Sequence, residues 1–220
     1  MTAISSSYNN QIFKPTEFKC LLKYHSGIPF RLSHVKCPEC KTTNLDIYGD
    51  HAISCSSSKQ RIAKHSKLIK FISSQISPFI PHRFEVKVGS DILGDIVLLD
   101  YKRNKDLYLD ITVVNSLCPT YLNAAAVSSG GAMAKRKQEK LIKYREVVER
   151  EGLAFLPLVV EILGGWDKQA LLLFKEISRK LSEYLFMEPQ VAIRRLMTGL
   201  SCILQKANAE MLVSRMYSPL

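Results

Sequence analysis

The sequence predicts a mixed α/β fold with a small metal-binding module placed ahead of the main core. Helical and strand-like hydrophobic patterns follow one another from residue 61 onward, in the order helix, three strands, helix, strand, helix, helix. Residues 33–58 lack such periodicity and are rich in Cys, His, Ser and turn-forming residues. The length of 220 residues suits one domain with a small satellite module.

The composition is that of a globular protein with a strongly basic balance. The chain carries 31 Lys and Arg against 20 Asp and Glu, a formal charge of +11, and 46% of its residues are hydrophobic. This content excludes a chain that is disordered throughout. The positive surplus indicates a polyanionic partner, and nucleic acid is the commonest polyanion inside cells. The alternative is a generally basic surface that binds no ligand.

The sequence predicts neither a membrane span nor a secretory signal. The longest apolar stretch, residues 153–165, contains Pro157 and Glu161 and is shorter than the ~20 apolar residues that a span needs. Residues 1–11 lack the basic start and apolar core of a signal peptide. We therefore expect an intracellular, reducing compartment, where clustered cysteines bind metal rather than form disulfides.

The first 58 residues are predicted to hold a flexible start, one short helix and the metal-binding module. Residues 1–14 form the flexible start, and residues 15–58 the helix and module. Helical spacing begins after Pro15 and stops before Gly27. The positions at this spacing are Phe18, Leu21, Leu22 and His25.

Residues 59–186 are predicted to form the main core, which opens with a helix and three strands. The helix runs from Arg61 to Pro78 and has an apolar and a basic side. Its apolar positions are Ile62, Leu68, Ile69, Ile72 and Ile76. The strands cover residues 84–88, 95–100 and 107–114, and the last two form a hairpin centred between Lys102 and Arg103.

The second half of the core is predicted to contain one strand among helices. Residues 118–131 are expected to be a long loop because they contain Pro119, two serines and two adjacent glycines. A helix, a strand buried on both faces and two further helices follow, at residues 133–150, 153–161, 168–186 and 189–212. Residues 187–220 are assigned as a C-terminal helical extension.

A zinc site is predicted at Cys37, Cys40, His51 and Cys55. Structural zinc is bound tetrahedrally by Cys and His, and two of its ligands commonly come from a Cys-x2-Cys turn. Without such a site, residues 33–58 have no reason to be ordered. His65 is a weaker competing ligand. The isolated cysteines, which we expect to be small apolar core residues, are Cys20, Cys118 and Cys202.

Two carboxylates are predicted to face each other on the hairpin. A turn between Lys102 and Arg103 sets Asp95 opposite Asp110, and opposed side chains have Cβ atoms ~5 Å apart. Two such carboxylates repel each other unless a cation lies between them, and hard oxygen ligands suit Mg²⁺. The alternative is that each Asp only ends a strand. Asp110 lies within an apolar strand, where an unpaired carboxylate is costly.

The helix from residue 133 carries a basic stripe. Lys137, Lys140 and Tyr144 lie at i, i+3 and i+7, beside the apolar line, so at least one ammonium group can lean over the sheet edge. Metal ions and a lysine near a phosphate stabilise developing charge and activate water. The alternative is a solvated basic face.

Seven segments, in this order, carry a resemblance to a known family. They are CPEC (37–40), GDHAISC (49–55), RIAKH (61–65), GDIVLLD (94–100), LDITVVNSL (109–117), KLIKY (140–144) and FLPLVVEILGGW (155–166). Together they resemble the C-terminal part of site-specific non-LTR retrotransposon proteins, where a CCHC zinc knuckle precedes a restriction-like endonuclease of the PD-(D/E)xK superfamily. The resemblance covers roughly residues 18–185.

The resemblance implies a PD-(D/E)xK restriction-endonuclease-like core with an inserted zinc knuckle. It implies that Asp95 and Asp110 bind catalytic Mg²⁺ or Mn²⁺ and that Lys140, displaced from the strand onto the next helix, is the catalytic lysine, with Lys137 as the alternative. Thr112 stands where the commoner motif has its lysine, and Gly94 where proline is usual. Accessory ligands could come from Glu85 and Glu161.

Three functions are compatible with these features. The first is a metal-dependent endonuclease that nicks DNA and, as the resemblance implies, acts in the nucleus. The second is a catalytically inactive zinc-dependent nucleic-acid-binding remnant, and the third a docking domain for a missing reverse transcriptase. The nucleic-acid contacts that we expect come from Lys59, Arg61, Lys64, His65, Lys67, Lys70, Lys137 and Tyr144.

The resemblance also leaves the origin of the chain open. The reverse-transcriptase region that precedes this unit in such elements does not occur in the sequence. The alternatives are a fragment of a longer protein, a decayed copy and a stand-alone remnant. RNA of the parent element is a further expected partner.

Overall fold

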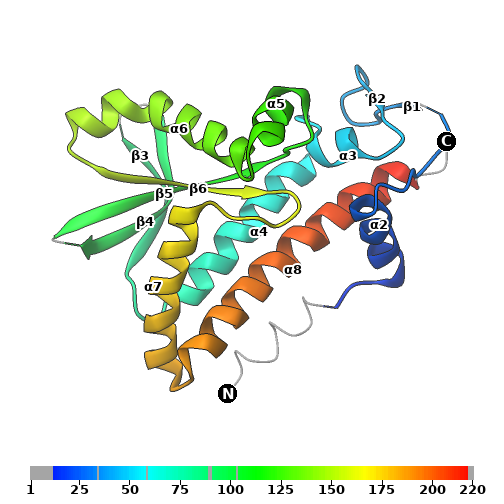
Figure 1. Cartoon of the computed structure of the whole chain (residues 1–220). Coiled ribbons are helices and arrows are strands. Elements are labelled where there is room, and N and C mark those ends of the chain that lie inside the picture. The colour runs from blue at the N-terminus through cyan, green and yellow to red at the C-terminus, as the bar shows by residue number, and fades with distance from the viewer. Residues whose placement is uncertain (1–11, 34, 58, 89–90, 103, 218–220) are drawn as a thin grey trace.

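The computed structural model describes residues 12–217 except 34, 58, 89–90 and 103, with backbone only at 91–93 and 102. The flexible start predicted for residues 1–14 thus lies outside the described residues, apart from its last three. Within the described part, the predicted mixed α/β fold is confirmed: a four-stranded mixed sheet lies among seven helices (Figure 1). None of these helices has the length and apolar character needed to cross a membrane.

The central sheet follows the predicted element order. Helix α4 (Lys59–Ile76) leads into strand β3 (His82–Val88), and β4 (Asp91–Lys102) and β5 (Lys105–Val114) follow. The strand β6 (Ala154–Glu161) completes the sheet in the order β3-β4-β5-β6. The first three strands are antiparallel, whereas β6 runs parallel to β5 after a helical crossover.

The hairpin has the predicted register but a different turn. Ile96 pairs with Leu109, so Asp95 and Asp110 occupy the next opposed positions along the strands. At the other end Lys102 pairs with Lys105, which places the turn one residue later than predicted. An irregularity between Leu98 and Lys102 absorbs the difference, and Asp100 within it has a left-handed φ of 49°.

The long loop predicted for residues 118–131 is wrong, because most of it forms helix α5 (Pro119–Val127). Pro119 occupies the first helical turn, where its missing N–H costs nothing, and three consecutive alanines favour the helix. The next helix, α6 (Gly131–Arg150), also begins earlier than predicted. A Cβ on Gly131 would lie 1.9 Å from the carbonyl oxygen of Ala124, so glycine allows the two helices to pack closely.

Helices cover both faces of the sheet. Helix α4, α7 (Lys168–Leu185) and α8 (Pro189–Met216) lie on one face, whereas α5 and α6 lie on the other (Figure 1). The larger core lies on the α4 side and includes Ile96, Leu109, Ile111, Leu158 and Phe174. Because side chains alternate along a strand, Asp110 between Leu109 and Ile111 faces α6 instead.

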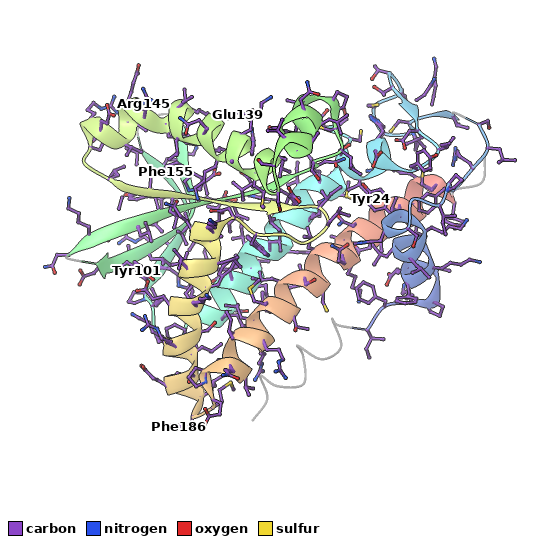
Figure 2. All side chains as sticks on the ribbon, in the orientation of Figure 1. Tyr24, Tyr101, Glu139, Arg145, Phe155 and Phe186 are labelled. Atoms are coloured by element: carbon purple, nitrogen blue, oxygen red, sulfur yellow. The ribbon has the colours of Figure 1, made fainter. Side chains whose placement is uncertain are left out.

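The C-terminal helix belongs to the core rather than forming an extension of it. Leu196, Leu200 and Leu204 of α8 pack in the main core beside α4 and α7, and Leu212 and Met216 pack in the smaller N-terminal cluster. The predicted boundary at residue 187 therefore separates two helices that share one core. This predicted boundary coincides with the turn between α7 and α8, where Phe186 points outward (Figure 2).

The N-terminal unit is small and packs against the end of α8. It consists of helix α2 (Pro15–His25), strands β1 (Val35–Lys36) and β2 (Asn44–Leu45) and helix α3 (Asp50–Ser54). Helix α2 has the predicted bounds but a different buried face. The buried apolar residues are Cys20, Leu21 and Tyr24, whereas Phe18 and Leu22, which carried the predicted helical spacing with Leu21, are exposed.

Candidate functional site

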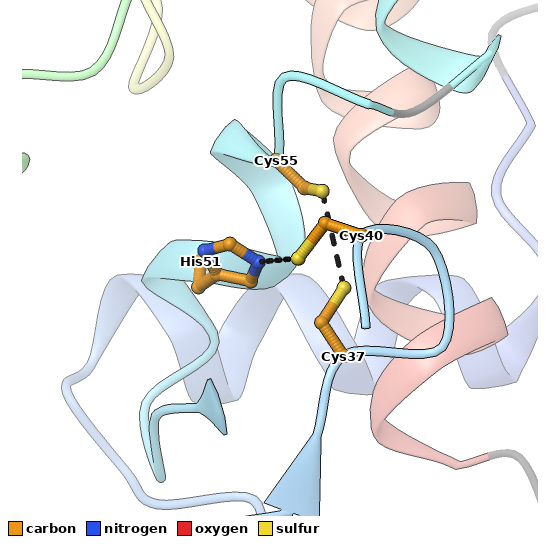
Figure 3. Close-up of side chains that lie close together, drawn as sticks. All are labelled: Cys37, Cys40, His51 and Cys55. Carbon is orange, nitrogen blue, oxygen red and sulfur yellow. Dashed lines mark hydrogen bonds between the residues drawn. The ribbon is translucent and has the colours of Figure 1, made fainter. Parts of the chain in front are cut away.

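Four predicted zinc ligands meet at one point in the N-terminal unit. Cys37 and Cys40 lie on the turn after β1, His51 lies in α3, and Cys55 follows that helix. Their ligand atoms all lie within 4.8 Å of one another. Figure 3 shows the four side chains pointing toward one another. This cluster can hold a metal ion, and within the described residues no other cluster of three or more His, Cys, Asp or Glu does so.

The spacing of the ligand atoms fits a tetrahedral ion. The Sγ atoms of Cys37 and Cys55 are 3.9 Å apart, and Sγ of Cys40 lies 3.4 Å from Nε2 of His51. A tetrahedral zinc ion with ordinary bond lengths sets S–S at about 3.8 Å and S–N at about 3.6 Å. Hydrogen bonds from Thr42 and Thr43 lower the pKa of the Cys40 thiol to about 5, which favours the thiolate that binds metal.

Asp46 organises the half of the cluster that contains His51, and the sequence analysis missed it. Its two carboxylate oxygens accept hydrogen bonds at 2.7–3.0 Å from the backbone N–H groups of Tyr48, Gly49, Asp50 and His51. These groups form the start of α3, which has no other side-chain cap. An Asp three residues before Gly49 is the signal that could have identified this turn.

The metal cluster is anchored to both neighbouring helices. The hydroxyl of Tyr24 on α2 donates a 2.8 Å hydrogen bond to Asp50 of α3. Arg215, near the end of α8, is buried and donates to the carbonyl of Ala52 and, at 3.0 Å, to Oε1 of Gln60 on α4. The cluster is therefore linked through α8 to the helix that borders the carboxylate site.

The second candidate site surrounds Asp95 and Asp110. Oδ2 of Asp95 accepts a 2.6 Å hydrogen bond from the N–H of Ile111, the residue after Asp110. This contact replaces the backbone pairing that ends at Ile96 and Leu109. The register therefore sets the two aspartates at opposed positions of the hairpin, as the sequence predicted. Among the described residues, Asp95 and Asp110 do not belong to a group of three or more metal-ligating side chains.

Lys140 is paired with Asp110, whereas Lys137 is not. Nζ of Lys140 lies 2.8 Å from Oδ1 of Asp110, and both side chains are largely buried. Lys137 instead forms a 2.5 Å ion pair with Asp167, the residue that caps α7. Of the two lysines left open by the sequence, Lys140 is the one that pairs with Asp110.

The remaining partner of Asp110 is Thr112. Its hydroxyl donates a 3.0 Å hydrogen bond to Oδ2 of Asp110. The residue that stands in place of the motif lysine therefore contacts the same carboxylate as Lys140 does. Asp110 is 6% exposed, and these two donors satisfy a carboxylate that would otherwise be costly to bury.

Tyr144 is buried and lies beside Lys140 and Lys143 rather than facing solvent. Its ring is 5% exposed, packs edge-on against Phe155 of β6, and lies 5.8 Å from Nζ of Lys140 (Figure 2 places Phe155 beneath α6). Its hydroxyl accepts a hydrogen bond from Lys143. The prediction that Tyr144 contacts nucleic acid directly is therefore wrong, because the ring is covered by β6.

His65 lies in the carboxylate site and not in the metal cluster. Its Nε2 is 3.1 Å from Oδ2 of Asp95 and 2.7 Å from the carbonyl oxygen of Ile111. Burial acts to lower the pKa of His65, but the hydrogen bond and charge of Asp95 outweigh it, so the pKa is raised. Because 34% of the His65 side chain is exposed, its predicted contact with nucleic acid stays a prediction.

The basic face of α4 is smaller than predicted. Lys64 is 2% exposed and donates a 3.0 Å hydrogen bond to Oδ1 of Asn208, so the prediction that it contacts nucleic acid is wrong. Lys67 is exposed but forms a 2.6 Å ion pair with Glu210. Lys59 and Arg61 are exposed, and neither forms an ion pair within the described part of the chain.

The two glutamates named as accessory ligands differ in their place relative to the aspartates. Glu85 lies on the edge strand β3 between the pairs Phe84–Ile96 and Val86–Gly94, so it occupies the position opposite Asp95, where it is exposed and has a left-handed φ of 46°. Glu161 pairs with Val114, four residues beyond Asp110 along β5, and burial raises the pKa of its carboxyl. Four residues of strand span about 13 Å, too far for a shared ion.

Comparison with known protein families and with curated proteins found no match. The family named from the motifs therefore stays a prediction.

Proposed function

We propose that this chain is a metal-dependent DNA endonuclease domain of the kind found in non-LTR retrotransposon proteins. The observation that carries the proposal is the ion pair between Lys140 and Asp110 directly across the hairpin from Asp95. Two opposed carboxylates can hold a metal ion, and a lysine paired with one of them can stabilise the charge that develops on phosphate during phosphodiester hydrolysis. The element order from α4 to β6 also supports the restriction-like core that the motifs imply.

The carboxylates fit the hard cation that such a nuclease uses. Oδ1 of Asp95 has no hydrogen-bond partner among the residues that the structure describes, while its Oδ2 is held by the backbone. Asp110 offers two further oxygens, whose present partners are side-chain donors. Asp95 and Asp110 would hold Mg²⁺ or Mn²⁺, which when bound lowers the pKa of water and stabilises charge on phosphate.

Besides the metal ion, Lys140 would supply a positive charge to the phosphate. Its ammonium group lies against Asp110 and is largely buried, where charge stabilisation is stronger than in water. In the reaction, a water oxygen forms a bond to phosphorus while one phosphorus–oxygen bond to deoxyribose breaks. Lys140 would donate hydrogen bonds to the phosphate oxygens as their charge increases, and the ring of Tyr144 beside it would limit its movement.

The cysteine and histidine cluster would bind structural zinc and place α4 against the DNA. Zinc is the ion that three thiolates and one imidazole select in a structural site. The exposed basic residues near it, Lys59 and Arg61, would contact phosphates. A DNA substrate implies a nuclear location, and RNA of the parent element and a reverse transcriptase domain are further proposed partners.

A matched pair of substitutions tests the proposal. Asp110→Asn removes a ligand charge with little change of shape, so DNA cleavage should fall at least about a hundredfold while DNA binding persists. Asp100→Asn is the control, because Asp100 lies on the same hairpin and is exposed outside the site. Equal cleavage by both variants would contradict the proposal. DNA binding with no cleavage by the unmodified protein would favour the inactive binding remnant.

A further inference from the structure

A closed ring of hydrogen bonds holds Asp95 at the point where the hairpin opens. The backbone pairing of β4 and β5 ends at Ile96 and Leu109. Beyond it, the N–H of Ile111 donates to Oδ2 of Asp95, and the carbonyl of Ile111 lies 2.7 Å from Nε2 of His65. The same Nε2 closes the ring on Oδ2 of Asp95 at 3.1 Å. One imidazole therefore joins α4 to both strands.

The partners of His65 define where its proton lies. The carbonyl oxygen of Ile111 and the carboxylate of Asp95 are both acceptors, so Nε2 must carry a hydrogen. That N–H is present in the neutral Nε2–H tautomer and in the imidazolium alike. The contact therefore does not depend on the charge of the ring.

The ring of contacts fixes the rotation of the Asp95 carboxylate. The N–H of Ile111 acts on Oδ2, and so does the Nε2–H of His65, which Asp95 shares with the nearer carbonyl oxygen of Ile111. Oδ1 has no partner within the described residues. The Asp95 side chain is 14% exposed and that of His65 34%, so the contact lies at the border of the solvent. An oriented carboxylate binds an ion without first losing rotational freedom.

We infer that His65 is a positioning residue, which holds Asp95 so that Oδ1 is presented to the catalytic cation. This inference rests on the proposed endonuclease function. The two aspartates have different supports: Lys140 and Thr112 act on Asp110, whereas His65 and the backbone of β5 act on Asp95. Hydrogen bonds to metal-binding groups typically change metal affinity 10–100-fold when they are removed.

Mn²⁺ binding to the zinc-loaded protein without DNA tests the inference, with free Mn²⁺ measured by electron paramagnetic resonance. His65→Leu fills similar space without a donor, and we expect it to weaken Mn²⁺ binding about tenfold. His65→Gln places an amide N–H near the position of Nε2 and should restore affinity to within about threefold. His65→Asn is one methylene too short and should behave like the Leu variant. If His65→Leu does not fold, the comparison of Gln with Asn gives the same answer.

A second histidine provides the matched control. His82 is also half-buried and hydrogen-bonded, to Ser73 and the carbonyl of Ile80, away from the aspartates. His82→Leu should leave Mn²⁺ affinity unchanged. DNA affinity should change less than about twofold in every His65 variant, because the inferred role acts through Asp95.

The outcomes separate this inference from the proposed function. Wild-type Mn²⁺ affinity in both His65→Leu and His65→Asn would overturn the role of His65 and leave the endonuclease proposal intact. A loss of DNA affinity equal to the loss of Mn²⁺ affinity would identify His65 as a DNA contact instead. Failure of the unmodified protein to bind Mn²⁺ at all would overturn the inference and the proposed function together.

Discussion

Three largely buried charged side chains each have an identifiable partner. Asp110 is paired with Lys140, Lys137 with Asp167, and Lys64 with the neutral amide of Asn208. The first two pairs offset the cost of burial with an opposite charge. Lys64 has no such compensation, and burial, together with the nearby charges of Arg215 and Arg61, lowers its pKa to about 8.

The lowered pKa of Lys64 predicts a pH dependence of stability. Between the folded pKa of about 8 and the unfolded value of 10.5, the unfolded chain binds more protons, so the free energy of unfolding should rise with pH across this window. The rise from pH ~7.5 to ~9.5 should be on the order of 1–2 kcal/mol and should be absent in Lys64→Met. Urea unfolding of both proteins at the two pH values measures it. Lys67→Met is the exposed control, and identical pH dependence in Lys64→Met and wild type would contradict the prediction.

Alanine substitutions at two glycines with left-handed φ distinguish the cost of backbone strain from the cost of overpacking. Gly49 has φ 91°, and a Cβ there would lie 2.8 Å from Cδ2 of Leu212, whereas Gly27 has φ 62° and open space around it. Gly27→Ala should cost about 1 kcal/mol from backbone strain alone. Gly49→Ala should cost at least about 2 kcal/mol, because overpacking adds to the strain. Urea unfolding compares them, and equal costs would show that Leu212 can move away freely.

Residue identity and spacing were enough to predict the ligands but not the environment of each basic residue. The Cys and His spacing and the position of Asp110 within an apolar strand are local patterns. The structure brings the four Cys and His ligands together and sets Asp110 opposite Asp95, as expected. Burial of Lys64 depends on Asn208, which is 144 residues away in the sequence. The pattern of residues near Lys64 in the sequence therefore does not predict its contact with Asn208. The same holds for Tyr144, which is covered by Phe155.

Three faces of helix α4 make different contacts. Leu68, Ile72 and Ile76 pack in the main core, His65 reaches the carboxylate site, and Lys59 and Arg61 face solvent. Its element type followed from helical periodicity, but it spans Lys59–Ile76 rather than Arg61–Pro78, and Ile62 of the predicted apolar line is exposed. The prediction of a loop at α5 was wrong because proline, serine and glycine suggested a turn. Pro119 instead begins helix α5, and the two glycines lie after that helix, at the start of α6.

The exposed basic end of α4 predicts a salt-dependent contact with DNA. Replacing Lys59 and Arg61 by Ala should reduce the slope of log affinity against log salt by about 1.8, since each phosphate contact contributes about 0.9. Fluorescence anisotropy with a short DNA duplex between about 50 and 200 mM NaCl measures the slope. Replacing Lys175 and Arg194, which are exposed on α7 and α8, is the charge-matched control. A slope unchanged by the first pair would place the DNA on another face.

The N-terminal unit depends on its metal cluster because its own apolar core is small. Freshly purified, reduced protein should contain about one zinc ion per chain, and Cys37→Ser should lose it and destabilise the unit. Metal analysis by mass spectrometry gives the content. Cys118→Ser should leave it unchanged, because Cys118 caps α5 outside the cluster. Wild-type protein without zinc would contradict this prediction.

At the scale of the whole molecule, α8 connects the two candidate sites. Its first half packs on α4 and α7, and its last turns carry Leu212 and Arg215 into the N-terminal unit (Figure 1). Along the way, Asn208 holds Lys64, the residue before His65 on α4. The metal cluster and the carboxylate site are thus built on one continuous set of helices. The sequence predicted both sites but not this connection, because it depends on contacts between distant segments.

Asp95, Asp110 and Lys140 are proposed to cleave DNA together, and nicking of supercoiled plasmid is a direct test of this claim. Zinc-loaded protein should convert supercoiled plasmid to the open circular form with Mg²⁺, and the conversion should stop when EDTA removes the ion. Lys140→Ala should slow the conversion at least about tenfold with little change in DNA affinity, since its contribution belongs to the transition state. Absence of Mg²⁺-dependent nicking by unmodified protein that is folded, zinc-loaded and bound to the plasmid would contradict the claim.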